Sequence, residues 1–475
     1  MGIGALNYQG VKGGIKLNDV IEEFKYAYKG QEIKAGDFVN YINGVASSVS
    51  STSSETTITT SRNAQQTIFA VQLTENKFVI FGSPGTSMGD SVVGWAIVGI
   101  FENATIQLGA LVYTPVGILL TYQPSATKIS ENSILLVGCT NTYADRYLCG
   151  VVATISGTTI SFGSVTNISA IKTASGRFTS CVSCDDNKVF VTHEHASSNP
   201  HTSGIVCTIS GTTITAGTDI NLTTGAWVVY CNLGLLEKNK IFVVADDDGG
   251  SRGIYGYICT IEGTTITMGT QVSIGTSGDS YGYGTSLAVF SPNKVVLSYG
   301  KGGSNYNLYG MVCTVDGTTI TKGTNTLVSS TKHAYQTSIL KINENKAFVS
   351  ILGATSDGLY GMFYLIDDTT ITGGTLTTLS TNSHGFSDNN LWSLMLSDNN
   401  ALVLWTQPDP YYGSMQLWKM DIVNNIPTNH IVVNNYEQQV TPSTQPPFDA
   451  IALSNGTGGT STAHNQQVKI AKPNL

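Results

Sequence analysis

The chain has 475 residues, of which 12% are charged, and its formal net charge is −8 at pH 7. Lysine and arginine are too few to form a basic face for nucleic acid or acidic lipid, and the longest nearly apolar stretch is too short to cross a membrane as a helix. Glycine, threonine, serine and asparagine are abundant whereas glutamate and lysine are sparse, a composition that favours an all-β fold.

The first 53 residues are predicted to lie outside the repeats that follow. Residues 16–30 (KLNDVIEEFKYAYKG) indicate a short helix, because Asn18 can cap its start, its apolar side chains form a stripe, and Gly30 can end it. Residues 31–45 (QEIKAGDFVNYINGV) then alternate in the manner of two strands. These elements are expected to form part of a small domain.

Residues 54–424 repeat one phrase, of which CTISGTTITAG is an example. The glycine of GTTI, or another turn residue in its place, stands at Asn103, Gly157, Gly211, Gly263, Gly317 and Asp368. A second mark, an asparagine just before a strand such as KVFV, stands at Asn76, Asn132, Asn187, Asn239, Asn293, Asn345 and Asn399. These asparagines are 52 to 56 residues apart, and a period of this length made of strands and turns predicts a β-propeller of seven antiparallel four-stranded blades. The GTTI phrase is then the hairpin between the third and fourth strands of a blade, and its recurrence reflects the scaffold.

The last copy stops without a TTI strand, and a matching strand precedes the first copy. Residues 54–61 (SETTITTS) are therefore predicted to complete the seventh blade, which closes the ring and removes an open edge. Residues 446–475 suggest two strands about a Gly-Thr turn. Because a propeller brings its chain ends together, residues 1–53 and 425–475 are predicted to build one small β domain for docking, with the propeller inserted in it.

The loops that differ between copies are the candidate binding surface. In an antiparallel blade the recurrent turns lie on one face of the disc, and the second-to-third loops and the blade crossovers lie on the other. These variable loops are rich in aromatic and small polar residues, which suit sugar rings or protein epitopes. The recurrent Tyr255, Tyr309 and Tyr360 are interpreted as packing residues. The candidate ligand-binding residues are the aromatics that do not recur: Trp227, Tyr281, Tyr283, Tyr306, His333, Tyr335, His384, Tyr411 and Tyr412.

Three polar clusters could carry chemistry, and none completes a known pattern. His193, Glu194 and His195, with His201 nearby, could bind a metal. Neighbouring residues of a strand point to opposite faces, so at most His193 and His195 can converge. Residues 246–250 (DDDGG) lack the spaced ligands of a calcium loop. The third cluster, Asp185 and Asp186, precedes a turn and is interpreted as part of it. No recurrent pair of carboxylates indicates glycoside hydrolysis, so no metal, cofactor or enzymatic activity is predicted.

The eight cysteines are interpreted as buried free thiols. Cys207, Cys259 and Cys313 share a position of the repeat with alanine in an earlier copy, which is typical of a small buried site. Cys181 and Cys184 form a CxxC, but the sequence lacks the second pair of ligands that a zinc site needs, which favours free thiols here too. A bound metal or a disulfide is the alternative interpretation. Free thiols are compatible with assembly in a reducing cytoplasm.

Three segments together resemble proteins of phages and prophages of Gram-positive bacteria. The matching pieces are IKAGDFVNYI near the start, the CTISGTTIT and NKVFV repeats, and the IALSNGTGG and VKIAKP segments near the end. The resemblance covers most of the chain and implies a propeller-bearing component of a virion or a phage-tail-like particle, such as a tail fibre or a baseplate appendage. It implies no catalytic residues. The first fourteen residues lack the apolar region of a signal peptide, which agrees with assembly in the bacterial cytoplasm.

These observations lead to one expected function and two alternatives. The expected function is attachment to a host cell surface, to a glycan or a protein, through the variable face of the propeller. The partners would be other virion or tail proteins bound through the small domain, and several copies of the chain could assemble together. The first alternative is a structural decoration of the capsid, neck or tail. The second is a glycan-cleaving enzyme, which would need acids converging on the central channel.

Overall fold

The chain divides into two compact units. Residues 1–53 together with 439–475 form the terminal unit, and residues 54–438 form the propeller unit. None of the residues described below belongs to a helix long and apolar enough to cross a membrane. The computed structural model describes residues 20–27, 32–33, 38–42, 45–48, 56–58, 65–84, 94–102, 105–120, 124–140, 146–172, 179–195, 201–223, 228–247, 253–275, 285–301, 307–330, 334–353, 358–380, 391–396, 400–406, 413–421, 426–429, 433–434, 450–452, 456–457 and 467–473.

The terminal unit is a small barrel made from both ends of the chain. Its strands are β1 (Val20–Ala27), β2 (Glu32–Ile33), β3 (Phe38–Ile42), β4 (Val45–Ser48), β41 (Ala450–Ala452), β42 (Gly456–Thr457) and β43 (Gln467–Pro473). Strands β1, β4, β3, β41 and β43 close into a barrel in that order, and β2 pairs with β42. The barrel therefore needs strands from both chain ends.

The short helix predicted for residues 16–30 is not present, because the described part of this segment is strand β1. Strand β1 pairs antiparallel with β43 from Val20↔Pro473 to Tyr26↔Gln467. Its backbone groups are thus used in a ladder with residues far away in the sequence. Helix propensity is a weak preference that tertiary pairing overrides.

Six sheets of the propeller unit share one pattern of five strands. Their strands, sheet by sheet, are β11 (Ser125–Ser130), β12 (Ser133–Cys139), β13 (Tyr147–Ser156), β14 (Thr159–Phe162) and β15 (Thr166–Lys172); β16 (Ser180–Asp185), β17 (Lys188–His195), β18 (His201–Ser210), β19 (Thr213–Ala216) and β20 (Ile220–Asn221); β21 (Val228–Glu237), β22 (Lys240–Asp247), β23 (Ile254–Glu262), β24 (Thr265–Met268) and β25 (Val272–Gly275); β26 (Ser286–Ser291), β27 (Lys294–Lys301), β28 (Asn307–Asp316), β29 (Thr319–Lys322) and β30 (Thr326–Ser329); β31 (Gln336–Asn343), β32 (Lys346–Leu352), β33 (Leu359–Asp367), β34 (Thr370–Gly373) and β35 (Thr377–Ser380); and β36 (Leu391–Leu396), β37 (Asn400–Thr406), β38 (Gly413–Asp421), β39 (Ile426–Asn429) and β5 (Thr56–Ile58).

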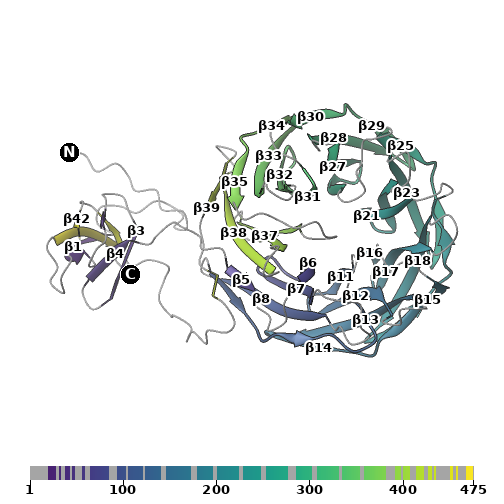
Figure 1. Cartoon of the computed structure of the whole chain (residues 1–475), viewed down its shortest axis with the longest axis horizontal. Coiled ribbons are helices and arrows are strands. Elements are labelled where there is room, and N and C mark those ends of the chain that lie inside the picture. Colours follow the sequence, from purple (N-terminus) through teal and green to yellow (C-terminus); the bar gives the residue numbers. More distant parts are fainter. Residues whose placement is uncertain are drawn as a thin grey trace. The chain divides into compact units, whose positions relative to one another are not determined.

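Within each of these sheets the fourth and fifth strands are two parts of one outer strand. Strand β14 pairs with the second half of β13, and β15 pairs with its first half. Counted from the inside of the ring outward, each blade is therefore antiparallel and four strands deep, as predicted, with the first strand innermost (Figure 1).

The sheet of the first repeat differs from the other six. Because only six blades share the five-strand pattern, the prediction of seven equivalent blades is wrong. Its strands are β6 (Gln65–Gln72), β7 (Lys77–Pro84), β8 (Trp95–Glu102), β9 (Thr105–Leu108), β10 (Val112–Tyr113) and β40 (Val433–Asn434). The sheet has six strands because β40 pairs in parallel with the outer edge of β9. Strand β40 belongs to the propeller unit, which spans residues 54–438.

An N-terminal strand closes the ring, although not in the predicted position. Strand β5 pairs with Gly413–Met415 of β38, while β39 pairs with the other half of β38. Strand β5 thus supplies the fifth strand of the last blade, because residues 426–429 already supply the fourth. First strands pack side by side in chain order, and β36 packs against β6 (Figure 1).

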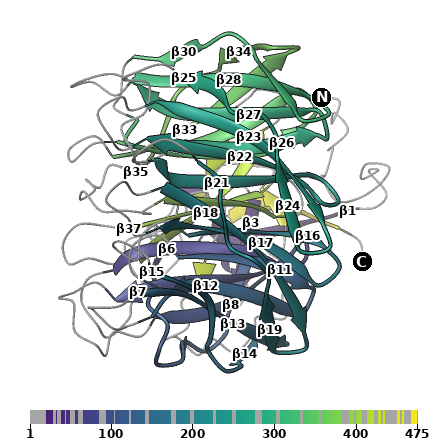
Figure 2. The same cartoon turned by 90° about the vertical axis from the view of Figure 1, so that its right-hand side faces the viewer.

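Apolar side chains fill the space between neighbouring sheets. Figure 2 shows these sheets from the side. Val152 and Val191, from two successive sheets, are fully buried in one such cluster. At the closing seam Ile97 of the first sheet packs in the same cluster as Leu402 and Leu404 of the last. These buried clusters hold each sheet to the next and make a firm frame for the residues at the centre.

The recurrent GTTI phrase serves this contact between sheets. Its glycine takes a left-handed backbone, with φ of 59° at Gly157, and Asp368 takes φ of 50° in the same place. The glycine six residues later is held against the next sheet's turn, where a Cβ atom would meet a threonine. These pairs are Gly109 with Thr158, Gly163 with Thr212, Gly217 with Thr264, Gly269 with Thr318, and Gly323 with Thr369. The phrase is therefore part of the scaffold.

On the face with the short turns, Asp185 joins two neighbouring sheets. Its Oδ1 atom lies 2.6 Å from Nζ of Lys238 in the next sheet's turn, and its Oδ2 accepts a hydrogen bond from Nδ2 of Asn239 at 3.3 Å. The hydrogen bond from Lys238, and after it the one from the backbone of Asp186, lower the pKa of the Asp185 carboxyl far below its usual range. The predicted turn residue is thus also an inter-sheet contact.

Replacing Asp185 by asparagine is expected to lower thermal stability at neutral pH, and the loss should shrink as the pH falls below about 4. The pKa of this carboxyl is depressed in the folded chain, so its stabilising contribution is present above the unfolded-state pKa and is lost as the pH falls. Thermal unfolding of Asp185→Asn and of the natural chain at about pH 7 and about pH 2 measures the difference, which should be smaller at the lower pH. Asp186→Asn is the matched control, because that side chain is 97% exposed. An equal loss of stability at both pH values would contradict the role given to Asp185.

Candidate functional site

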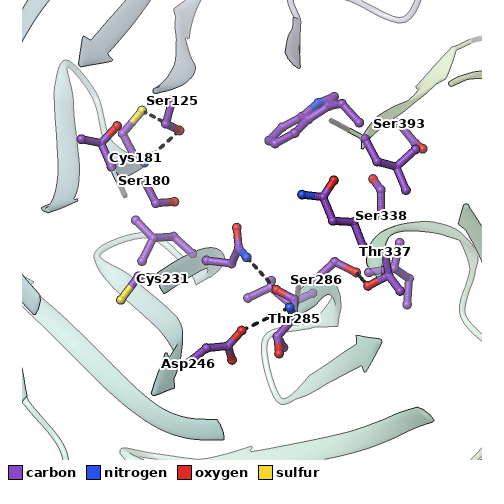
Figure 3. Close-up of a pocket in the computed structure, with 18 of the residues that line it drawn as sticks. Ser125, Ser180, Cys181, Cys231, Asp246, Thr285, Ser286, Thr337, Ser338 and Ser393 are labelled. Carbon is purple, nitrogen blue, oxygen red and sulfur yellow. Dashed lines mark hydrogen bonds between the residues drawn. The ribbon is translucent and has the colours of Figure 1, made fainter. Parts of the chain in front are cut away.

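The first strands of the blades surround a central cavity of about 280 Å³ (Figure 3). Its lining residues lie where these strands begin, for example Ser125 and Ala126 of β11 and Ser286 and Leu287 of β26. The blade crossovers lead into these strand ends. The cavity therefore lies at the end of these strands where the chain enters each blade.

One position of the repeat supplies much of this lining. It lies seven residues before the turn asparagine of each copy, and in six copies it is occupied by Ser125, Ser180, Asn232, Ser286, Ser338 and Trp392, all of which line the cavity. Small residues suit this position because the innermost strands converge on the axis and leave little room. Their hydroxyl and amide groups give the cavity a polar wall.

Hydrogen bonds between neighbouring sheets fix many of these polar groups. Ser286 Oγ lies 2.8 Å from Thr337 Oγ1, which donates to the carbonyl oxygen of Ser298 at 2.8 Å. Ser125 Oγ accepts a hydrogen bond from the backbone N–H of Cys181 at 3.2 Å. The wall is thus preorganised, and a ligand would meet groups whose positions are already set.

A group of acceptors gathers around Thr285. Its carbonyl oxygen accepts a hydrogen bond from Asn232 Nδ2 at 2.6 Å, and its backbone N–H donates to Oδ2 of Asp246 at 3.3 Å. Figure 3 shows Asp246, Thr285 and Ser286 on one side of the cavity. The Thr285 side chain is 2% exposed, and its Oγ1 atom has no hydrogen-bond partner among the described residues.

Trp392 gives the cavity an aromatic surface. It is half-buried, and its ring lies 6.2 Å from that of Phe69 in an edge-on arrangement. In the ring of first strands, β36 lies three places from both β16 and β21, so Trp392 faces the part of the wall that contains Asn232. An aromatic face opposite a polar wall is an arrangement that accommodates a sugar ring.

The described lining of the cavity has little charge. Among the described residues that line it, Asp246, which is 2% exposed, is the only charged one. Cys181 and Cys231 also line it, and burial raises the pKa of each thiol to about 12, so both are neutral. The electrostatic character of the described lining is therefore set by one carboxylate.

The structure describes one of the nine predicted ligand-binding residues. Tyr335 is half-buried, its backbone N–H donates to the carbonyl oxygen of Leu352 at 2.8 Å, and it directly precedes the lining residues Gln336 and Thr337. The other eight lie outside the described residues, so they remain predictions: Trp227, Tyr281, Tyr283, Tyr306, His333, His384, Tyr411 and Tyr412.

The cavity residues Trp392, Asp246 and Thr285 were not among those predictions. Trp392 lies in LWSLML, which the repeat identifies as an inner strand. Comparison of the position seven residues before each turn asparagine would have found it, because an aromatic residue there replaces serine or asparagine. No sequence signal places Asp246 beside Thr285, since they come from different sheets.

The histidines of residues 193–195 do not converge on a metal site. His193 is fully buried, with Nε2 2.9 Å from Oδ2 of Asp219, and Ser169 donates to the same oxygen at 2.6 Å. His195 stacks on His201 with ring centroids 4.3 Å apart. Burial lowers the pKa of His195, and the neighbouring histidines lower it further. The cluster joins the sheets of β15 and β17, and the carboxylate lies between the serine and the histidine, which is not the order of a nucleophilic triad.

The other predicted packing and cluster residues can be placed as well. Tyr360 is 5% exposed and Tyr309 stacks on Tyr299, so packing is confirmed for both of these recurrent tyrosines. All eight cysteines are free and buried, which confirms the prediction for Cys181 and Cys184 in particular. Within the described ranges no group of three or more His, Cys, Asp or Glu side chains could hold a metal ion.

Comparison with models of known protein families finds no match, and comparison with curated proteins finds no relative in sequence. Solved structures do resemble this chain. The BP39L lectin from Burkholderia pseudomallei has a TM-score of 0.56 at 11% identity, and the match covers 75% of this chain and 96% of the lectin. A putative 6-phosphogluconolactonase from Bacteroides uniformis has a TM-score of 0.51 at 9% identity, covering 74% and 95%. One from Bacteroides fragilis has 0.50 at 10%, covering 75% and 94%. At these identities the likeness concerns the fold alone: the chain is an all-β protein with a β-propeller.

Proposed function

We propose that this chain binds a glycan of a bacterial cell surface at the centre of the loop-bearing face of its propeller. The observation that carries the proposal is the central cavity, in which Trp392 faces a wall of hydroxyl and amide groups. One face of a sugar ring is more apolar than the other, and hydroxyl groups surround the ring. A sugar therefore matches an aromatic surface that lies opposite hydrogen-bonding groups. The volume of about 280 Å³ suits one sugar residue of a longer glycan.

Binding fits the described cavity better than glycan cleavage does. Glycoside hydrolysis commonly uses two carboxyl groups about 5–10 Å apart on either side of the scissile bond. Among the described residues that line the cavity, Asp246 is the one carboxyl group. A single buried carboxylate can hold a ligand by hydrogen bonds, whereas acid–base cleavage requires a second carboxyl group, which the described lining does not contain.

We further propose that the chain is a component of a virion or a phage-tail-like particle that is assembled in the bacterial cytoplasm. The support is the resemblance of IKAGDFVNYI, the GTTI repeats and VKIAKP to proteins of phages and prophages. The terminal unit would dock the chain to other particle proteins, since it is a compact unit of its own. Several copies on one particle would turn weak binding at each cavity into firm attachment.

Two measurements test this function. The purified chain is screened against bacterial wall glycans, and binding that Trp392→Ala weakens is the expected result. Particles induced from the source strain are then labelled with immunogold against the propeller, and gold at the tail tip or baseplate is expected. Gold on the head or neck, with no binding to wall material, would favour the decoration role and would overturn the receptor-binding proposal.

A further inference from the structure

We propose that the central cavity recognises the N-acetyl group of an amino sugar, with Asn232 as the acceptor for its amide N–H and Leu287 as the contact for its methyl group. This inference rests on the proposed glycan binding and names the class of ligand for the same cavity. Both residues belong to innermost strands and line the cavity. Asn232 is exposed and Leu287 is partly exposed, so a ligand in the cavity can reach each of them.

A hydrogen bond sets the direction of the Asn232 side chain. Its Nδ2 atom donates to the carbonyl oxygen of Thr285 at 2.6 Å. Because a carbonyl oxygen only accepts, the amide group of Asn232 cannot turn around without losing this bond. Its Oδ1 atom has no hydrogen-bond partner among the described residues. The bond to Thr285 therefore leaves an acceptor in the lining whose position is already set for an N–H group of a ligand.

Leu287 supplies an apolar surface beside this acceptor. A Cβ atom at Gly234 would lie 2.6 Å from Cδ1 of Leu287, so the leucine occupies the space that a side chain at Gly234 would take. Asn232 and Gly234 are two residues apart in a regular part of β21, where alternate residues share a face of the sheet. The side chain of Leu287 therefore lies next to Asn232 along the same face of β21.

These two groups match the two parts of an acetamido substituent. Its N–H is a single donor, and its methyl group is apolar and close to that donor. A hydroxyl in the same place on the sugar can also donate to Asn232, but it leaves the surface of Leu287 without a contact. Because burying a methyl group against an apolar side chain is favourable, the lining should distinguish an N-acetylated sugar from the parent sugar.

The test is calorimetric titration of the full-length chain with N-acetylglucosamine oligomers and with glucose oligomers of the same length and linkage, which lack the acetamido group. The N-acetylated oligomer is expected to bind about 5- to 20-fold more tightly. Asn232→Ser should remove most of this preference, and the fold should tolerate it because four other copies have serine at this position. Leu287→Ala should lower the affinity for the N-acetylated oligomer more than the affinity for the glucose oligomer.

Saturation-transfer NMR adds a readout of the contact itself. The acetyl methyl protons should receive the strongest saturation from the natural chain and clearly less from Leu287→Ala. Asn167→Ser and Leu327→Ala are the matched controls, because both residues are exposed on outer strands and neither lines the cavity. Both control variants should keep the preference.

Equal affinity for the two oligomers, or a preference that survives in both Asn232→Ser and Leu287→Ala, would overturn the inference. If the two oligomers bind equally and Trp392→Ala weakens both, glycan binding stands and the N-acetyl preference alone falls. If neither oligomer binds, the inference is overturned, and the screen against wall glycans decides the proposed function separately.

Discussion

Replacing Trp392 by alanine is expected to weaken glycan binding about tenfold, while the propeller remains folded. The indole is half-buried and lines the cavity, so its free face is the apolar surface on which a sugar ring can lie. Losing that contact costs roughly 1–2 kcal/mol of binding free energy. Calorimetric titration with the glycan identified by screening measures the loss.

Two controls separate this contact from a general loss of structure. Trp392→Phe retains an aromatic face and should retain most of the affinity. Tyr113→Ala removes an aromatic side chain that is 45% exposed on an outer strand, and it should leave binding unchanged. Unchanged affinity in a folded Trp392→Ala variant would show that the glycan does not lie on the indole. Thermal unfolding of each variant checks the fold, since the indole also packs edge-on against Phe69.

Replacing Gly109 by alanine is expected to lower the free energy of unfolding of the propeller unit by about 1–3 kcal/mol. A Cβ atom at this position would lie 2.4 Å from the carbonyl oxygen of Thr158 in the next sheet. The obstacle is backbone, which cannot rotate away as a side chain can, so the two sheets must separate slightly. The measurement is the midpoint of urea unfolding compared with that of the natural chain.

Gly157→Asn is the matched control for this contact. Gly157 belongs to the same recurrent phrase, but a Cβ atom there meets nothing within 4 Å. Its φ of 59° is tolerated by asparagine, and Asp368 takes the equivalent place with φ of 50°. Its stability should change by about 0.5 kcal/mol or less. Equal effects of the two substitutions would mean that glycine serves backbone freedom at both positions and not the contact between sheets.

The repeat made most of the fold predictable. Its period, the turn asparagines and the GTTI phrase each mark the same strand in successive copies, so an error in one copy is corrected by the others. The prediction failed where the repeat stops: residues 426–429 (IPTN) take the fourth-strand place without the TTI pattern, and β40 widens the first sheet through two residues. Strands this short show little of the alternation of apolar and polar residues that identifies a strand in a sequence. Their pairing depends on contacts that form only when the ring of blades closes.

The candidate site was less accessible to sequence reasoning. The aromatics of the variable loops were chosen because they do not recur, and this choice passed over Trp392, which lies in an inner strand. Asp246 is the penultimate residue of one strand and Thr285 precedes another, so their contact depends on how far each strand reaches toward the axis. The distance of each strand end from the axis is set by how the sheets pack, and it cannot be derived from composition or from the spacing of the repeats.

The double pairing at the seam has a consequence for how the chain is made. Strand β5, from the start of the propeller unit, pairs with β38 near its end, and β40, from the end, pairs with β9 near the start. During synthesis at about 5–20 residues per second, both early strands must wait until residues 413–434 have left the ribosome. The nascent chain therefore carries two open edges for most of its synthesis, and pairing so distant in sequence makes closure slow. Once both are paired, the ring can open only by releasing two separate ladders, so this feature is expected to slow unfolding and to give the finished protein a long lifetime.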